Sequence, residues 1–144
     1  LGDDDDPLQS DDSLDETMQR FSKADRLVNP KRRSHEKEIL FPEPLMKFIK
    51  PHQREGIRFM WMNIQMPPSD DLRGCILAHS MGLGKTFQTC TFVYLFWCHE
   101  RRPKVLILAP KVTLANWAAE FHMWTCDKVQ LPRPIPVYQI DAVP

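Results

Sequence analysis

The sequence contains 144 residues, the size of one ordinary domain, and 42% of them are hydrophobic, which is too many for a wholly disordered chain. The chain begins at Leu1 rather than Met, so we expect a piece of a longer protein. No apolar run approaches the roughly 20 residues that cross a bilayer and no secretory leader is present, so we expect neither a membrane-spanning nor a secreted protein. The four cysteines form no Cys-x-x-Cys pair, which favours buried reduced thiols over a zinc site.

The formal net charge is zero, but the charges are distributed unevenly. Residues 1–16 contain eight acidic residues and no basic residue. The remaining 128 residues therefore carry 11 acidic and 19 basic residues, a net charge of +8. This pattern predicts a solvated acidic leader followed by a basic body that contacts nucleic acid.

Residues 1–12 are rich in Asp, and we predict that they form a disordered acidic leader. Residues 13–43 are predicted to be a helix followed by a basic linker. Ser13 and Glu16 match a capping box, apolar residues recur at helical spacing as far as Val28, and Pro30 ends the helix. The basic cluster at 31–33 is interpreted either as a phosphate contact or nuclear targeting signal, or as a solvated linker.

Residues 44–144 are predicted to form the main folded unit. The prolines at 42 and 44 indicate an extended or irregular segment over 41–48. Pro51 suits the first turn of a helix, because its missing N–H costs nothing there, and that helix would end before Pro67. Its apolar side would carry Ile57, Met60, Trp61 and Ile64.

Short apolar runs then alternate with helical patterns. Buried strands are predicted at 75–78, 105–109 and 137–140. A helix that is apolar on nearly all sides is predicted over 85–99, and another begins at Thr113, either as a plain N-cap or as part of a ligand site. The order strand–helix–strand–helix–strand predicts an α/β fold with a parallel sheet and flanking helices.

The strongest chemical signal is the loop Met81-Gly82-Leu83-Gly84-Lys85-Thr86, between a predicted strand and a predicted helix. Glycines allow backbone amides to point inward around phosphates, and the helix N-terminus adds a positive dipole end. Lys85 would reach the β- and γ-phosphates of ATP, and the Thr86 hydroxyl would ligate Mg²⁺. The loop departs from the general pattern at one position, where His79 replaces a Gly.

Two further segments flank the loop. Gln53, in Lys50-Pro51-His52-Gln53, offers a donor and an acceptor that match the edge of adenine, although most Gln residues are simply solvated. After the second predicted strand, Lys111, Thr113 and Asn116 open a helix that could hold a nucleic-acid phosphate. Aromatic residues in the predicted helices are interpreted as core rather than as base-stacking platforms: Trp61, Phe92, Phe96, Trp97 and Trp117.

Together the three segments resemble the start of a Swi/Snf-type DNA translocase of the second helicase superfamily, over roughly residues 45–125. The segment around Gln53 resembles the Q motif of that family, 81–86 match its motif I, and 109–121 resemble motif Ia and the following helix. Most of the family has an acidic pair before Met81, whereas this chain has His79 and Ser80. Both this pair and the sequence at 29–37 resemble the corresponding segments of the ATRX-like branch of the family. That branch includes the androgen-receptor-interacting helicases.

The resemblance implies a nuclear, ATP-driven enzyme that moves along double-stranded DNA and remodels chromatin. It implies a partial RecA-like lobe, the first part of ATPase lobe 1, with ATP and Mg²⁺ as cofactors and Lys85 and Thr86 as catalytic residues. The other ATP contacts would be Gln53, Met81, Gly82, Leu83 and Gly84. Motif II and the second lobe lie outside this sequence, so we expect the chain to be inactive alone.

Two alternatives remain open. The phosphate loop by itself also permits another P-loop enzyme, such as a small-molecule kinase. The acidic leader and the helix predicted at 13–28 are compatible with a non-catalytic interaction module that binds protein partners through its N-terminal segment.

Overall fold

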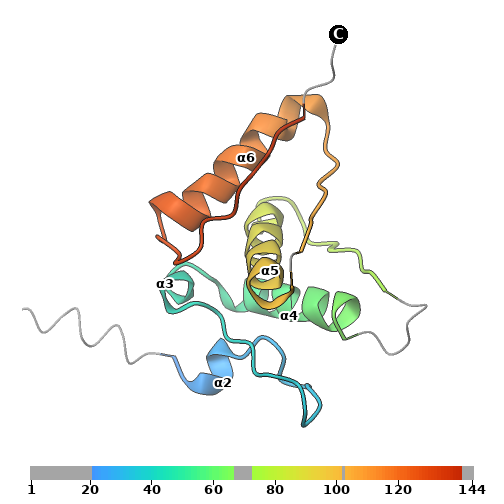
Figure 1. The fold of residues 1–144 in the computed structure, drawn as a ribbon, viewed down its shortest axis with the longest axis vertical. Coiled ribbons are helices and arrows are strands. Elements are labelled where there is room, and N and C mark those ends of the chain that lie inside the picture. The colour runs from blue at the N-terminus through green and yellow to red at the C-terminus, as the bar shows by residue number, and fades with distance from the viewer. Residues whose placement is uncertain (1–20, 67–72, 102, 141–144) are drawn as a thin grey trace, which may run out of the picture.

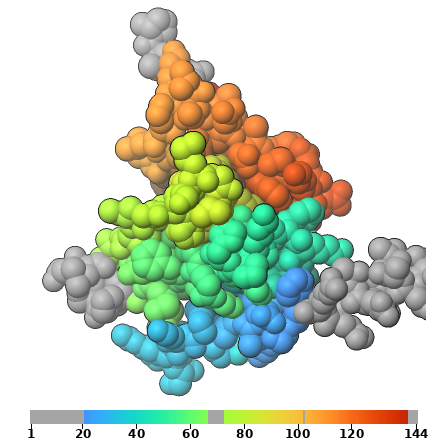
Figure 2. Space-filling model, turned by 180° about the vertical axis from the view of Figure 1, so that it is seen from behind, coloured from blue at the N-terminus to red at the C-terminus, as the bar shows by residue number. Residues whose placement is uncertain are grey.

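The computed structural model describes residues 21–66, 73–101 and 103–140, and within these residues every regular element is helical (Figure 1). The elements are α2 (Lys23–Arg26), α3 (Glu43–Met46), α4 (Pro51–Ile64), α5 (Lys85–His99), a 3-10 turn (Lys111–Thr113), α6 (Leu114–His122) and a π-helical turn (Met123–Asp127). Helices α4 and α5 pack against each other at the centre, α6 lies on one side of them and α2 on the other. In Figure 2 the blue residues occupy the end opposite the orange residues, and the teal residues lie between them.

Helix α4 confirms the helix predicted from Pro51. Pro51 occupies the first helical position, and the helix ends at Ile64, before the prolines at 67 and 68. Ile57 is fully buried, and Met60 and Trp61 are at most 5% exposed. Because these residues recur at helical spacing, α4 presents one apolar side to the core.

Helix α5 spans the predicted residues, 85–99, and is the centre of the hydrophobic core. Its buried residues include three aromatic side chains, and only its ends are exposed. The Trp61 ring on α4 meets Phe92 edge to face, with ring centroids 5.9 Å apart. Trp61 and Phe92 are therefore core residues, as the sequence predicted.

The predicted parallel sheet is wrong for the residues described. The segments 73–80, 103–110 and 134–140 are extended, but no strand is formed within them, and the described residues contain only one isolated bridge, Leu27 to Leu40. Cys75, Leu77 and Ile107 pack against the helical core. The side chains that alternate with them point outward, and three of these are 77–86% exposed: Ile76, Leu106 and Leu108. A parallel sheet needs both faces covered, and here helices cover only one side of each segment.

Within the described residues, the N-terminal segment is less helical than predicted. Half of the helix predicted over 13–28 lies outside the described residues, and in the other half α2 is a single turn that ends at Arg26. Its capping box joins Ser22 and Asp25. Farther along, the irregular segment predicted over 41–48 contains the short helix α3, since Pro44 is tolerated in a first turn.

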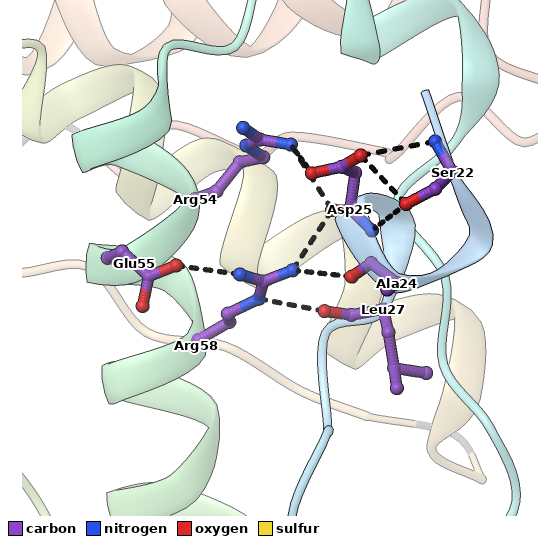
Figure 3. A network of polar contacts seen from close by, with 7 residues as sticks. All are labelled: Ser22, Ala24, Asp25, Leu27, Arg54, Glu55 and Arg58. Carbon is purple, nitrogen blue, oxygen red and sulfur yellow. Dashed lines mark hydrogen bonds and ion pairs between the residues drawn. The ribbon is translucent and has the colours of Figure 1, made fainter. Parts of the chain in front are cut away.

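Two arginines of α4 fasten α2 to the core (Figure 3). Arg58 donates from Nε to the Leu27 carbonyl at 2.8 Å and from Nη2 to the carbonyls of Ala24 and Asp25, each at 3.0 Å. Arg54 Nη1 lies 3.2 Å from Asp25 Oδ1. Carbonyls at the end of α2 are thereby bound by charged donors, although that of Ala24 also accepts from the Leu27 amide at 3.3 Å. We call this set of contacts the arginine clasp.

The segment that follows the clasp closes a loop against the core. The Val28 amide donates to the Ile39 carbonyl at 2.8 Å, and the Phe41 amide donates to the Arg26 carbonyl at 2.7 Å. The buried Asn29 side chain holds the loop from inside by donating to the Lys37 carbonyl and accepting from the Ile39 amide. Residues 21–41 therefore share a core with α4 and α5.

None of the helices within the described ranges is long and apolar enough to span a membrane. The four cysteines are free, and the part of the chain that is described contains no group of three or more side chains suited to a metal ion. Cys90 is buried in α5, and this burial raises the pKa of its thiol to about 12. Cys90 is therefore a core residue rather than a nucleophile.

Candidate nucleotide-binding site

The glycine loop before α5 has an open backbone. Gly82 and Gly84 have φ angles of 79° and 76°, in the left-handed region that favours glycine. Gly84 is the N-cap of α5, so the loop leads directly into a 15-residue helix. Among the described residues, no protein acceptor takes a hydrogen bond from the backbone amides of residues 81–86. The yellow-green loop region lies uncovered on the face shown in Figure 2.

Lys85 folds back over the loop that precedes it. Its Nζ donates to the His79 carbonyl at 2.7 Å and to the Ser80 carbonyl at 3.2 Å. The ammonium group is thus held by two neutral carbonyls, with no carboxylate as a partner. Its positive charge remains uncompensated next to the open amides, which makes the loop a favourable place for an anion.

Three side chains converge on the carbonyl of Leu83. His52 Nε2 lies 3.2 Å from this oxygen, and Gln53 Nε2 and Gln88 Nε2 each lie 3.3 Å from it. His52 and Gln53 belong to α4, whereas Gln88 belongs to α5. The carbonyl is therefore fixed from both helices.

The structure brings Gln53 to the phosphate loop, as its position in the sequence suggested. Gln53 is only 8% exposed, and its Oε1 accepts from the Lys50 amide at 3.0 Å while its Nε2 contacts Leu83. A Cβ atom added to Gly84 would lie 2.4 Å from Gln53 Nε2, so only glycine fits beside it. Both ends of the Gln53 amide are occupied by backbone, and an adenine contact stays a prediction.

Thr86 and two of the three predicted nucleic-acid residues, Thr113 and Asn116, line one cavity. A cavity of about 370 Å³ between the start of α5 and α6 is lined by Thr86, Thr113, Asn116, Trp117, Ala119 and Glu120. Lys111 is exposed on the 3-10 turn and does not line it. Thr113 does not cap α6 with its side chain, because its hydroxyl donates to the Pro110 carbonyl at 2.8 Å. The exposed Met81 and the glycines lie on the loop itself.

Reasoning from the sequence missed two residues of this site. Gln88 is fully buried, although a Gln on a helix is usually solvated. The signal that could have found it is its place among apolar neighbours in 85–99. His52 was not singled out, and no spacing rule would have placed its ring beside Leu83, 31 residues away.

A loop of this shape, with glycines at positive φ leading into a helix at Lys-Thr, is the arrangement of a phosphate-binding loop. Residues 52–135 match the SNF2-related domain, and the chain therefore belongs to the SNF2-related family. It is 40% identical to Helicase ARIP4 of Homo sapiens over 110 residues, which cover 74% of this chain and 8% of that protein.

Other relatives agree with this family. The chain is 38% identical to Protein CHROMATIN REMODELING 20 of Arabidopsis thaliana over 124 residues, 81% of this chain and 8% of the relative. It is 42% identical to the Transcriptional regulator ATRX homolog of Drosophila melanogaster over 87 residues, 56% of this chain and 7% of the relative. The chain thus spans less than a tenth of the length of these relatives. No solved structure matches it.

Proposed function

We propose that this chain is the ATP-binding part of a DNA-dependent ATPase that moves along double-stranded DNA and remodels chromatin in the nucleus. The observation that carries the proposal is the open loop at 81–86, whose amides have no protein acceptor among the described residues and which adjoins an ammonium group with no carboxylate partner among those residues. The names of the relatives, a helicase and a chromatin remodeller among them, support the substrate class.

The residues of the loop fit ATP and Mg²⁺. The amides of 81–86 and the Lys85 ammonium would hold the phosphates, and the half-buried Thr86 hydroxyl would ligate the metal ion. Mg²⁺, when bound, would neutralise the charge that develops on the phosphates. Within the protein, Gln53 and Gly84 keep the loop in shape, because their close packing fixes the start of α5 against α4.

The residues proposed to contact DNA lie close to this loop. Thr113 and Asn116 share a cavity with Thr86, and Lys111 is exposed at the start of the same helical segment. A phosphate held near Lys111 would sit beside the helix that packs on α5, which places DNA contact and nucleotide contact on neighbouring elements.

The test is ATP hydrolysis by the full-length protein with and without duplex DNA. We expect DNA-stimulated hydrolysis that Lys85→Ala abolishes, while Lys104→Ala, which removes an exposed lysine far from the loop in sequence, leaves it unchanged. Residues 1–144 alone should hydrolyse no ATP. Turnover that ignores DNA and depends on a small phosphate acceptor would indicate a kinase instead. No binding at millimolar ATP would indicate an interaction module.

A further inference from the structure

We propose that Gln88 is a positioning residue for the phosphate loop: its buried carboxamide ties the Leu83 carbonyl to the His79 ring and so holds the loop in the shape that binds ATP. The proposal deepens the proposed function and rests on it. Gln88 lies on α5, three residues after Lys85, and its side chain is fully buried.

The two hydrogens of the Gln88 amide reach two different parts of the loop. Nε2 lies 3.3 Å from the Leu83 carbonyl and 3.2 Å from His79 Nδ1. Because an amide nitrogen can only donate, His79 Nδ1 must accept, which fixes the tautomer of that ring. His79 precedes the glycine turn and Leu83 lies within it. One side chain therefore joins the entry of the loop to its apex.

The other end of the Gln88 amide is packed against α4. Its Oε1 is buried and has no hydrogen-bond partner in the described part of the chain. A Cβ added to Gly56 would lie 1.9 Å from that oxygen, so glycine is required at position 56 for Gln88 to keep its place. A buried carbonyl without a hydrogen bond raises the free energy of the folded state. The two contacts of Nε2 with the loop offset this cost.

The same helix provides a matched comparison. Thr91 follows Gln88 by three residues, is 3% exposed, and also has a buried hydroxyl without a partner. Within the described residues it makes no hydrogen bond with the loop, so replacing it changes a buried polar group of α5 and leaves the loop alone. Comparing the ATP affinity of variants at these two positions separates the effect of the Gln88 contacts with the loop from the general effect of altering a buried polar residue of α5.

The experiment measures the affinity of the full-length protein for a fluorescent ATP analogue, together with its melting temperature. Gln88→Met keeps the size of the side chain but cannot donate, and we expect binding about tenfold weaker, the loss of two neutral hydrogen bonds. Thr91→Val should bind as the wild type does. If Gln88→Met binds equally well, the proposal is overturned and the proposed function stands. If the wild type binds no ATP, both are overturned.

A second test uses Gly56, and it separates positioning of the loop by Gln88 from a merely structural role of that residue. Gly56→Ala should displace Gln88, which lowers both the melting temperature and the affinity for ATP. Adding Gln88→Ala removes the clash with Gln88 and leaves only a 3.2 Å approach to His79 Cε1, so the double variant should regain melting temperature over Gly56→Ala while its affinity stays low. Recovery of both properties together would show that the Gln88 amide does not position the loop, and would overturn the proposal.

Discussion

Replacing Arg58 with Met would open the arginine clasp from the side of α4. The methionine keeps much of the apolar stem that packs on α4 but cannot donate to the carbonyls of Ala24, Asp25 and Leu27. Arg54 would still reach Asp25, so one contact of the clasp would remain. The expected result is local opening of residues 21–41 while α4 and α5 stay folded.

The free energy that Arg58 contributes depends on how well its side chain is shielded from water. The Arg58 side chain is only 17% exposed, and hydrogen bonds to charged groups contribute about 1.5–3 kcal/mol each when they are shielded from water. The carbonyls of exposed Ala24 and half-buried Asp25 can bind water once Arg58 is gone, so losing these two hydrogen bonds costs little. The hydrogen bond to the Leu27 carbonyl is the shortest of the three, and its loss accounts for most of the expected effect. We therefore expect about 2–3 kcal/mol in the free energy of local opening, or about 30- to 150-fold in its equilibrium constant.

Amide hydrogen exchange measures this opening directly. The amides of Val28 and Phe41, which bond across the segment, should lose protection by that factor in Arg58→Met. Glu55→Gln is the control, because it removes only the exposed ion partner of Arg58, and its effect should stay below about 1 kcal/mol. Unchanged protection of both amides in Arg58→Met would refute the reasoning, and so would an equal loss in the control.

Three further predictions concern the loop, the core and the N-terminal segment. Gly84→Ala should weaken ATP binding at least tenfold, measured by titration, because a Cβ there meets Gln53 Nε2 at 2.4 Å and φ is 76°. Cys90, with a pKa of about 12, should resist alkylation at pH 8 in the folded protein and react after denaturation, measured by mass spectrometry. Hydrogen bonds from Ser22 lower the pKa of Asp25 below 3.8, so the stability that its carboxylate adds is complete above that pH and is lost as pH falls through the folded pKa. Asp25→Asn should therefore weaken the segment at neutral pH, and its difference from the wild type in hydrogen exchange should shrink under acid conditions.

Local patterns predicted the two central helices well. The bounds of α4 follow from Pro51 at the start and the prolines at 67 and 68 at the end, and α5 follows from the glycine turn before Lys85. Each backbone hydrogen bond of a helix joins residues four apart, so its signals lie within a short stretch of sequence. The same logic failed at α2, where the capping box at Ser22 and Asp25 was not recognised.

The strands could not be inferred in the same way. Apolar runs at 75–78 and 105–109 do form extended segments, and alternate side chains do face the core. Whether an extended segment becomes a strand depends on a neighbour that supplies the hydrogen bonds and on cover for the second face. Neither condition can be read from the segment itself, and neither is met within the described residues.

The candidate site was predicted where its chemistry is local and missed where it depends on packing. The order Gly-x-Gly-Lys-Thr sufficed to place Lys85 and the open amides at the start of a helix. Gln53 was noted for its amide, yet the amide is engaged by Lys50 and Leu83 rather than free for a base. The role of Gln88 appears only once α4 and α5 lie together.

The arginine clasp bears on where a recombinant version of this domain can safely begin. The family match starts at residue 52, but several side chains that fill the core lie upstream of it: Val28, Ile39, Phe41, Leu45, Met46 and Ile49. A protein trimmed to residues 52–135 would expose the matching apolar side of α4 and leave Arg54 and Arg58 without their acceptors at residues 24–27. We expect such a truncated protein to aggregate when it is expressed. A protein that starts at or before Phe21 keeps the aromatic ring over which Arg54 lies.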